Sequence, residues 1–381
     1  MLHSFDVPPL CIASNSDGSR IAVGCVDGSV KFLNTENDSF ETIWEFKTKS
    51  CVRSIDIDET NEKVYAVIKN RALCAFDINT GRRTRCILKA HSAAPMVVCS
   101  LPPSSLKNQQ VATADEKGEV KTWDLRAECP VVRKWKEQEE EINELKIDSK
   151  HNLLSASSDG TLAAFDLRKG KLKVRSELMH SELLSICPTD KFTYVGGGDG
   201  FIEVFNHNEY GNLLERIESG FELGTNGIVE LRRGLLLTSS SGSNKLRLLN
   251  VMPNKRLGIM GTHGDEHEND GIDIMTLSGD KTTLFTAISF NCTIKKWELT
   301  PIVEKIPILR STDAKKKKNV GVGFFDDLIP EGQKNDEPKK KRRKEDDSDE
   351  ESDDEGEDEQ EDEDELEDED EEEEADDEDE E

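Results

Sequence analysis

The chain has 381 residues, with 80 Asp and Glu against 50 Lys and Arg, and a formal net charge of −30. No stretch approaches the roughly 18 apolar residues of a membrane-spanning helix, and no basic region followed by an apolar core opens the chain, so we expect neither membrane insertion nor secretion. Nine cysteines without a Cys-x-x-Cys motif indicate a reducing compartment.

Seven segments end alike, in a large apolar residue followed by Asp, Asn or Glu, and they recur every 40 to 48 residues. The endings are Leu33-Asn34, Phe76-Asp77, Trp123-Asp124, Phe165-Asp166, Phe205-Asn206, Leu249-Asn250 and Trp297-Glu298. This spacing is typical of a four-stranded propeller blade.

Each ending closes a predicted β-hairpin. In segments 21–34, 153–166 and 193–206 an apolar strand runs into an Asp-Gly turn, where glycine supplies the positive φ of a tight turn. Asn70-Arg71 and Asn291-Cys292 replace this pair in two other blades. Strands upstream of the hairpins are predicted at Val52–Ile57, Ile142–Ile147, Leu183–Cys187 and Ile272–Leu277.

These blocks resemble WD40 repeats over residues 1 to about 300. In that family a His, a Ser or Thr, an Asp and the Trp of one blade form a hydrogen-bonded set. The resemblance places three residues at the His position: His91, His180 and His263. Other positions of the three sets hold Lys117, Phe205 and Asn291, so no blade is expected to be complete, and apolar burial is expected to dominate stability.

The repeats predict an all-β fold, a single seven-bladed WD40 β-propeller over residues 1–309. An open ring would leave an edge strand free to pair with other chains. Strands of the seventh blade are expected near 272–277, 284–289 and 293–299. We therefore expect the residues around 1–5 to close the ring as the outer strand of that blade.

Composition changes after the propeller. Residues 310–344 carry 12 basic and 6 acidic residues, whereas residues 345–381 hold 31 Asp and Glu among 37 residues and no Lys or Arg. So charged a block cannot bury enough apolar area to offset chain entropy of roughly 1–2 kcal/mol per residue. Both segments are predicted to be disordered, and the acidic one is expected to bind basic proteins.

Three short motifs lie in these segments. The basic run Lys339, Lys340, Lys341, Arg342, Arg343 and Lys344 predicts a nuclear import signal read by an import receptor, or else a solvated charge run. Phe324, Phe325 and Leu328 would share one face of a short helix, a docking peptide unless they are a chance apolar island. Ser348 and Ser352, each followed by acidic residues, are candidate phosphorylation sites.

Catalytic and cofactor motifs are not found in the sequence, so a non-enzymatic binding scaffold without a cofactor or metal is expected. The cluster from His263 to His267 lacks the helical spacing of a His-Glu-x-x-His zinc site. The glycines of segment 196–200 precede a strand rather than the helix that a phosphate loop requires.

Basic residues follow the third strand of blade four and should form its outer strand. Alternation places Lys169, Lys171, Lys173 and Arg175 on one side. They are candidate contacts to RNA phosphates, although lysines on an edge strand also block association between sheets. Segments 82–85 and 133–136 hold three cations each, lie at equivalent outer positions and support either interpretation equally.

A different class of function is indicated by Arg126 and Arg168, each two residues after the Asp that ends a blade. The pattern resembles the Trp-Asp-x-Arg signature of propellers that dock onto the adaptor of cullin-RING ubiquitin ligases. The alternative is that the two arginines pair locally with Asp124 and Asp166.

The chain as a whole resembles the WD repeat-containing protein 55 family and its fungal nucleolar counterparts. The resemblance lies in segment 249–256 followed by Gly258 and His263, and in the order of propeller, Lys-rich connector, Phe-Phe motif and acidic end. It implies a protein of the nucleus and nucleolus that supports rRNA production and ribosome biogenesis, mainly of the large subunit, with pre-ribosomal proteins and pre-rRNA as partners. A cullin-RING substrate receptor is the alternative function.

Overall fold

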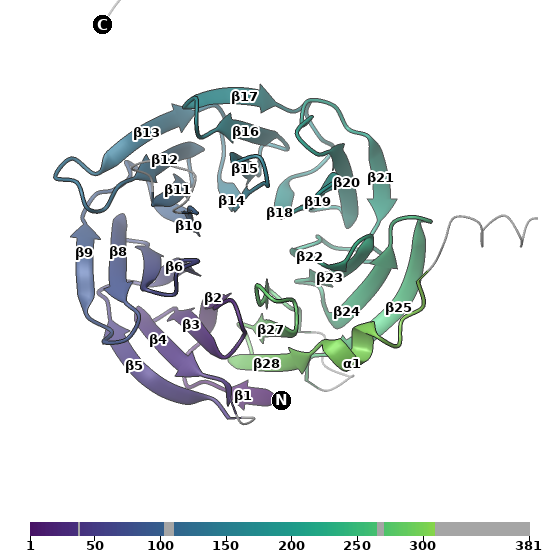
Figure 1. The fold of residues 1–381 in the computed structure, drawn as a ribbon, viewed down its shortest axis with the longest axis horizontal. Helices are drawn as coiled ribbons and strands as arrows, with labels where there is room; N and C mark the ends of the chain where they lie inside the picture. The colour runs from purple at the N-terminus through teal and green to yellow at the C-terminus, as the bar shows by residue number, and fades with distance from the viewer. Residues whose placement is uncertain (37–38, 103–109, 265–269, 309–381) are drawn as a thin grey trace, which may run out of the picture. The chain divides into compact units, whose positions relative to one another are not determined.

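The computed structural model describes residues 1–36, 39–102, 110–264 and 270–308. They belong to one compact unit, Met1–Val320. The described part of this unit forms seven four-stranded antiparallel sheets arranged in a ring (Figure 1). The predicted seven-bladed propeller is confirmed.

Four blades follow one another from the N-terminal side, and in each the strands run in chain order from the innermost to the outermost. They are β2 (Pro9–Ser14), β3 (Arg20–Cys25), β4 (Ser29–Asn34) and β5 (Glu41–Lys47); β6 (Val52–Ile57), β7 (Lys63–Ile68), β8 (Ala72–Asp77) and β9 (Arg83–Ile87); β10 (Pro95–Ser100), β11 (Val111–Asp115), β12 (Glu119–Trp123) and β13 (Val131–Lys136); β14 (Ile142–Ile147), β15 (Asn152–Ser157), β16 (Leu162–Asp166) and β17 (Lys171–Arg175).

Blades five, six and seven complete the ring: β18 (Leu183–Pro188), β19 (Phe192–Gly197), β20 (Phe201–Asn206) and β21 (Glu215–Glu218); β22 (Gly227–Arg232), β23 (Leu235–Ser240), β24 (Ser243–Asn250) and β25 (Lys255–Thr262); β26 (Ile274–Leu277), β27 (Thr283–Ile288), β28 (Thr293–Glu298) and β1 (Leu2–Ser4). Within the described ranges the single helix is α1 (Thr300–Val303), and no described helix has the length and apolar character needed to cross a membrane.

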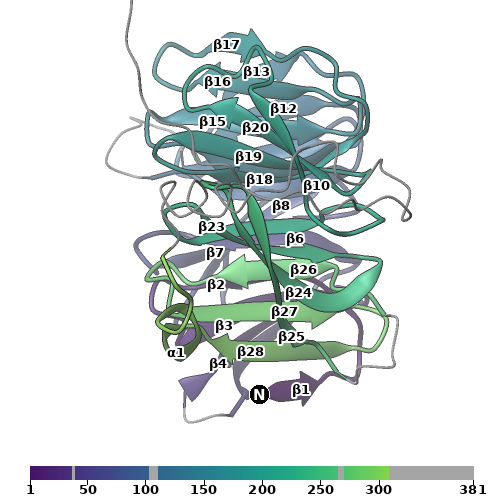
Figure 2. The same cartoon turned by 90° about the vertical axis from the view of Figure 1, so that its right-hand side faces the viewer.

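The ring is closed by β1, which pairs antiparallel with β28 at the rim (Figure 2). Met1 and Lys296 exchange two backbone hydrogen bonds of 2.9 and 2.8 Å, and Phe5 N–H donates to the Cys292 carbonyl at 2.7 Å. The predicted closure by the N-terminal segment is therefore confirmed. Pairing covers the edge of β28, which would otherwise expose unpaired backbone groups.

The core is divided into seven apolar clusters, one at each interface between neighbouring blades. Phe76, Phe165 and Phe205, each one residue before the end of the third strand of its blade, are fully buried. Burial of one such side chain contributes roughly 1.5–3 kcal/mol. Each sheet is thus covered on both faces, which explains why its middle strands read as nearly continuous apolar and small residues.

Turns follow the sequence prediction closely. Gly28, Gly160 and Gly200 of the Asp-Gly pairs have positive φ angles of 87°, 76° and 81°. Arg71 and Cys292 keep the same left-handed conformation with φ of 68° and 54°, even though neither is glycine. The hairpin geometry therefore persists in the blades that lost the Asp-Gly sequence.

Two of the predicted inner strands have the bounds that the structure shows. Observed β6 and β14 coincide with the predicted strands. In blade seven, β26 begins at Ile274, two residues later than predicted. The reason is that Ile272 N–H donates to the carbonyls of Ser240 and Ser243, at 3.0 and 3.1 Å, and so belongs to the connection with blade six.

The domain boundary predicted after residue 309 falls outside the described residues. The same holds for the predicted connector 310–344 and the predicted acidic tail 345–381.

Removing one closing hydrogen bond should weaken the ring. Along an antiparallel pair of strands, every second residue exchanges backbone hydrogen bonds with its partner. After Met1 the next such residue is His3, whereas the backbone N–H of Leu2 points away from β28. We expect His3→Pro to lower the free energy of unfolding by ~1–3 kcal/mol and to promote self-association, because it removes a ladder donor. Calorimetry and light scattering measure both effects.

Two matched variants isolate the backbone contribution. His3→Ala removes the same ring contacts to Phe5 and Phe40 but keeps the N–H. Leu2→Pro introduces proline at the neighbouring position, whose N–H faces solvent. Equal stability of His3→Pro and His3→Ala would contradict the importance of this pairing.

Candidate interaction surfaces and a buried polar cluster

Blade three contains a complete hydrogen-bonded set. Trp123 Nε1 donates to Thr113 Oγ1 at 2.7 Å, His91 Nε2 lies 2.6 Å from the same hydroxyl, and His91 Nδ1 lies 3.2 Å from Asp115 Oδ2. All four side chains are buried. The expectation that no blade carries the full set is therefore wrong.

The missing carboxylate is supplied by Asp115, two residues before Lys117. Asp115 ends β11, and its Oδ1 accepts the backbone N–H groups of Lys117 and Glu119 at 3.0 and 2.9 Å. Desolvation acts to raise the pKa of Asp115, but the hydrogen bonds from His91 and these N–H groups hold it below its usual value. The sequence pattern expects this carboxylate at the turn position, which Lys117 occupies, whereas Asp115 supplies it from the last position of β11.

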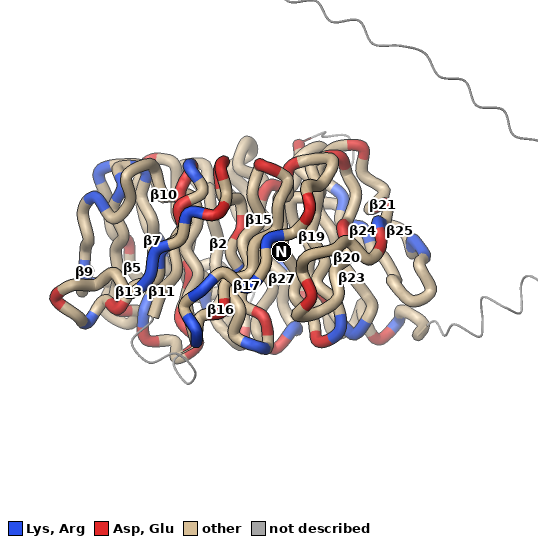
Figure 3. Tube along the Cα trace, turned by 90° about the horizontal axis from the view of Figure 1, so that it is seen from above, with Lys and Arg blue, Asp and Glu red and all other residues tan. Residues whose placement is uncertain are grey.

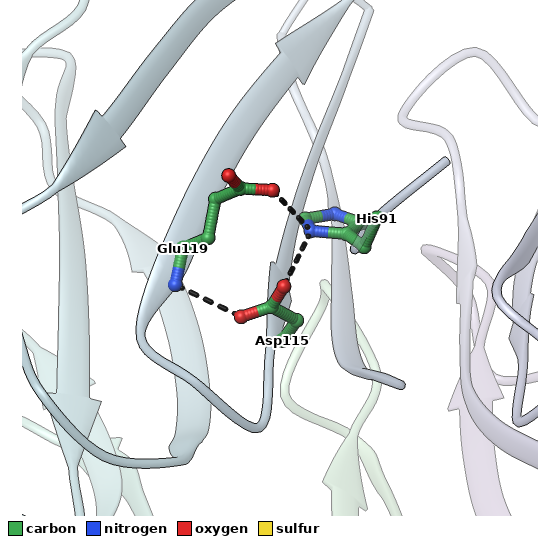
Figure 4. A group of neighbouring side chains, drawn as sticks. All are labelled: His91, Asp115 and Glu119. Atoms are coloured by element: carbon green, nitrogen blue, oxygen red, sulfur yellow. Dashed lines mark hydrogen bonds and ion pairs between the residues drawn. The ribbon is translucent and has the colours of Figure 1, made fainter. Parts of the chain in front are cut away.

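Glu119 adds a second carboxylate to this cluster (Figure 4), and the sequence analysis missed it. Its Oε2 lies 3.4 Å from His91 Nδ1 and 2.6 Å from Lys121 Nζ, and its Oε1 lies 2.5 Å from Lys134 Nζ. With Asp115 the three groups have the spacing of metal ligands. Two ammonium groups already balance Glu119, and both nitrogens of His91 are engaged, so the donor set favours a structural cluster.

The other blades keep parts of the set. In blade seven, His263 is buried between Thr286 Oγ1 (2.8 Å) and Thr293 Oγ1 (3.1 Å), and Trp297 Nε1 donates to Thr286. In blade four, Gln138 takes the histidine position, is 1% exposed, and hydrogen-bonds with Ser155 and Thr161.

Blade five differs from the prediction at His180, which is exposed. Strand register places Val195 and Gly197 where blade three has Thr113 and Asp115. With Phe205 in place of tryptophan, the set is not formed, and His180 makes no side-chain hydrogen bond to another described residue.

The candidate RNA-contact residues are separated by the structure. Lys171, Lys173 and Arg175 are exposed at alternate positions of the outer strand β17, as predicted. Lys169, however, lies in the preceding turn, 3.6 Å from Asp166 Oδ2, and is not part of the strand. Gly170, with φ of 68°, and the Asp166 carboxylate, which accepts the Lys169 N–H at 2.9 Å, hold this turn.

The two candidate adaptor-docking arginines differ. Arg126 forms a two-point ion pair with Asp124, with Nε to Oδ1 at 2.9 Å and Nη2 to Oδ2 at 3.0 Å, although 61% of its side chain is exposed. Arg168 is exposed, and its guanidinium has no hydrogen bond or ion pair to another described residue. Only Arg126 follows the local-pair alternative.

The central channel brings together charges that the sequence analysis did not single out. The inner strands surround a cavity of about 500 Å³. Lys146 Nζ lies 3.2 Å from Glu144 Oε1 there, and Asp56 accepts the Ser100 N–H at 2.6 Å. Desolvation raises the pKa of Asp56, whereas the Glu144 carboxylate raises the pKa of Lys146.

Several predicted sites lie outside the described residues. They are the Phe324, Phe325 and Leu328 motif, the basic run Lys339–Lys344, and the phosphorylation candidates Ser348 and Ser352. All of them stay predictions.

Thr113 is the centre of the blade-three set, and its hydroxyl serves two partners. We expect Thr113→Val to lower the free energy of unfolding by ~2–4 kcal/mol, because it leaves buried groups of His91 and Trp123 unpaired. Urea denaturation measures the change. Thr122→Val is the matched control, since Thr122 is equally buried and its Oγ1 has no hydrogen-bond partner among the described residues. Equal effects of both substitutions would contradict this role.

His263 should make stability depend on pH. Burial, then the charge of Lys295, lowers its pKa from 6.5 to about 4. The unfolded chain takes up a proton near pH 6.5 that the folded chain resists until about pH 4. Stability is therefore fully present above pH 6.5 and declines by ~3 kcal/mol as pH falls towards 4.

Urea denaturation at several pH values, compared between the parent chain and two variants, measures the contribution of His263. His263→Gln should show a smaller decline between pH 6.5 and 4 than the parent chain. His180→Gln, at an exposed histidine, should keep the parent profile. Identical profiles for all three proteins would rule out a contribution from His263.

Comparison with known proteins agrees with this architecture. The family model described as WD domain, G-beta repeat matches residues 2–34. A mitotic checkpoint complex crystal structure contains a chain that matches with a TM-score of 0.67 at 15% identity, covering 78% of this chain and 90% of that one. At that identity the match supports the fold alone.

Sequence relatives are more specific. WD repeat-containing protein 55 of Mus musculus is 30% identical over 268 residues, which cover 68% of this chain and 67% of the relative. The Homo sapiens protein of the same name is 29% identical over 271 residues, with 68% of each chain covered. With repeats, ring closure and these relatives in agreement, the chain belongs to the WD repeat-containing protein 55 family.

Proposed function

We propose that the chain is a non-enzymatic nucleolar scaffold that supports rRNA production and ribosome biogenesis, mainly of the large subunit. WD40 propellers are generally interaction scaffolds rather than enzymes. The resemblance described above and the predicted import signal at Lys339–Lys344 support the location, and the charge of the outer strands supports contact with RNA.

The observation that carries the RNA contact is the charge of three consecutive outer strands. Strands β9, β13 and β17 together hold eight Lys and Arg residues and no Asp or Glu. Basic segments lie along β9 and β13 in Figure 3. The outer strands β5 and β21 are different, because each has two Glu against one cation.

The difference between these outer strands helps to decide whether the cations bind phosphate or only protect exposed edge strands from pairing with other sheets. A charge of either sign on an edge strand discourages pairing between sheets. The carboxylates of β5 and β21 would serve that purpose as well as lysines. A run of cations alone on blades two to four therefore favours a negatively charged partner.

Most of these cations stay available for phosphate. Arg85 donates to the Ala127 carbonyl at 3.1 Å and Arg175 to the Glu137 carbonyl at 2.8 Å, and a neutral carbonyl does not cancel their charge. Lys134 is the exception, since it pairs with Glu119. Phosphate contacts of this kind give binding that does not depend on sequence and weakens with salt.

The test changes β17 and leaves the Lys134 pair intact. In the full chain, Lys171→Glu with Lys173→Glu and Arg175→Glu should reduce pre-rRNA recovered after ultraviolet crosslinking in nuclei by about tenfold, because three phosphate contacts become repulsive. The matched control, Lys255→Glu with Arg256→Glu, reverses exposed cations of the outer strand β25. Unchanged crosslinking in the β17 variant, or no RNA on the parent chain, would refute the RNA contact.

The same purification separates the ligase alternative. If the chain is a substrate receptor, Arg126→Glu with Arg168→Glu should remove a cullin-RING adaptor from the recovered proteins and leave pre-rRNA unchanged. If no adaptor copurifies with the parent chain, the receptor hypothesis fails while the scaffold hypothesis stands.

A further inference from the structure

A second surface feature lies between blades five and six, next to the basic blade four in the ring (Figure 1). A cavity of about 250 Å³ opens there. The turn from β18 to β19 supplies Lys191 and leads into Phe192, the turn from β22 to β23 supplies Arg233, and Met252 comes from the turn after β24. Two of these turns belong to blade six and one to blade five, so they meet only where the two blades pack together.

The wall of the cavity is apolar and includes one polar group without a partner. Phe192 and Tyr194 are buried, with ring centroids 6.2 Å apart, and Met252 is 53% exposed. Tyr194 is only 1% exposed, yet its hydroxyl makes no hydrogen bond to another described residue. Burial raises the pKa of Tyr194, so the hydroxyl keeps its proton and can donate it in a hydrogen bond.

The rim carries two exposed cations, Lys191 and Arg233. Lys191 Nζ lies 4.9 Å from the ring centroid of Phe192, and neither cation has an ion pair with a described residue. Glu230, one of two carboxylates in the wall, already has partners: it accepts the Gly234 N–H at 3.0 Å and lies 3.7 Å from Lys281 Nζ. Asp190 is the remaining carboxylate, which leaves an excess of positive charge.

The cavity is too small for most cofactors. Small-molecule sites usually occupy roughly 300–1,000 Å³, whereas this volume suits one bulky side chain. Backbone access is open beside it, because a Cβ placed on Gly234 would meet no atom within 4 Å. From size, apolar wall and charge, we propose that the cavity docks a peptide segment of a partner protein, with one bulky apolar side chain beside carboxylates.

Each part of the site has a role in this docking. The apolar side chain enters between Phe192 and Met252, and flanking carboxylates pair with Lys191 and Arg233. The Tyr194 hydroxyl donates to an oxygen of the peptide. The proposal is independent of the RNA contact, because it uses other blades and other residues.

The test measures binding of a fluorescein-labelled peptide, Asp-Asp-Leu-Phe-Asp-Asp, to the full chain by fluorescence anisotropy. We expect saturable binding in the micromolar range. Lys191→Glu with Arg233→Glu should weaken it by at least about tenfold, since two charge-assisted contacts become repulsive. Tyr194→Phe, which keeps the ring, should weaken it by about fivefold, the effect of one hydrogen bond.

The controls are a charge reversal away from the cavity and peptides that lack either the carboxylates or the apolar side chains. Lys150→Glu reverses an exposed cation in a turn of blade four and should leave binding unchanged. Peptides with Asn for Asp, or with Ser for Leu and Phe, should lose most of their affinity. Retained affinity of the Ser peptide would indicate a simple anion site, and equal binding by the Lys191 and Arg233 variant would place the peptide elsewhere; either result overturns the proposal.

The chain's own Phe324 and Phe325 are the competing occupant. If Phe324→Ser with Phe325→Ser strengthens binding of the labelled peptide, the motif of this chain fills the cavity and the assignment to a partner protein is wrong. Unchanged binding supports the partner. Pre-rRNA crosslinking of the Lys191 and Arg233 variant, measured in parallel, should stay normal, which distinguishes failure of this site from failure of the proposed scaffold function.

Discussion

The structure depends on the closure of a ring in which every sheet is buried on both faces. Seven apolar clusters lie at seven interfaces between blades, so no blade has a core of its own. Loss of one interface would expose two sheet faces at once. The pairing of β1 with β28 stabilises the whole ring, because it joins the two ends of the described propeller within one blade.

Polar sets contribute to this ring unevenly. Blade three has the complete His91, Thr113, Asp115 and Trp123 set, blade seven a partial set, and blade four a glutamine in its place. Blade five has none around His180. Buried polar groups usually have partners, but Thr122 Oγ1 of blade three and Thr193 Oγ1 of blade five have none among the described residues. Apolar packing is the feature that all interfaces share.

The proposed contacts use the surfaces that stay exposed to solvent after the blades have packed together. Inner and middle strands are enclosed by neighbouring blades, whereas outer strands and turns face solvent. Turns of different blades, such as those holding Lys191 and Arg233, come close only at an interface. Outer strands instead present long rows of side chains, which suits an extended polyanion. The two proposed contacts therefore use different geometric features of one scaffold.

The sequence by itself determined the period, the hairpin turns, the strands β6 and β14, and ring closure, because these follow from local patterns and from the need to cover an edge. Tertiary structure decided the rest. Asp115 reaches His91 from the last position of β11 rather than from the turn position that Lys117 occupies, and Lys169 leaves its predicted strand because the Asp166 carboxylate and Gly170 form a turn. The cavity at Tyr194 was not predictable, since its walls come from two blades whose approach depends on how they pack against each other.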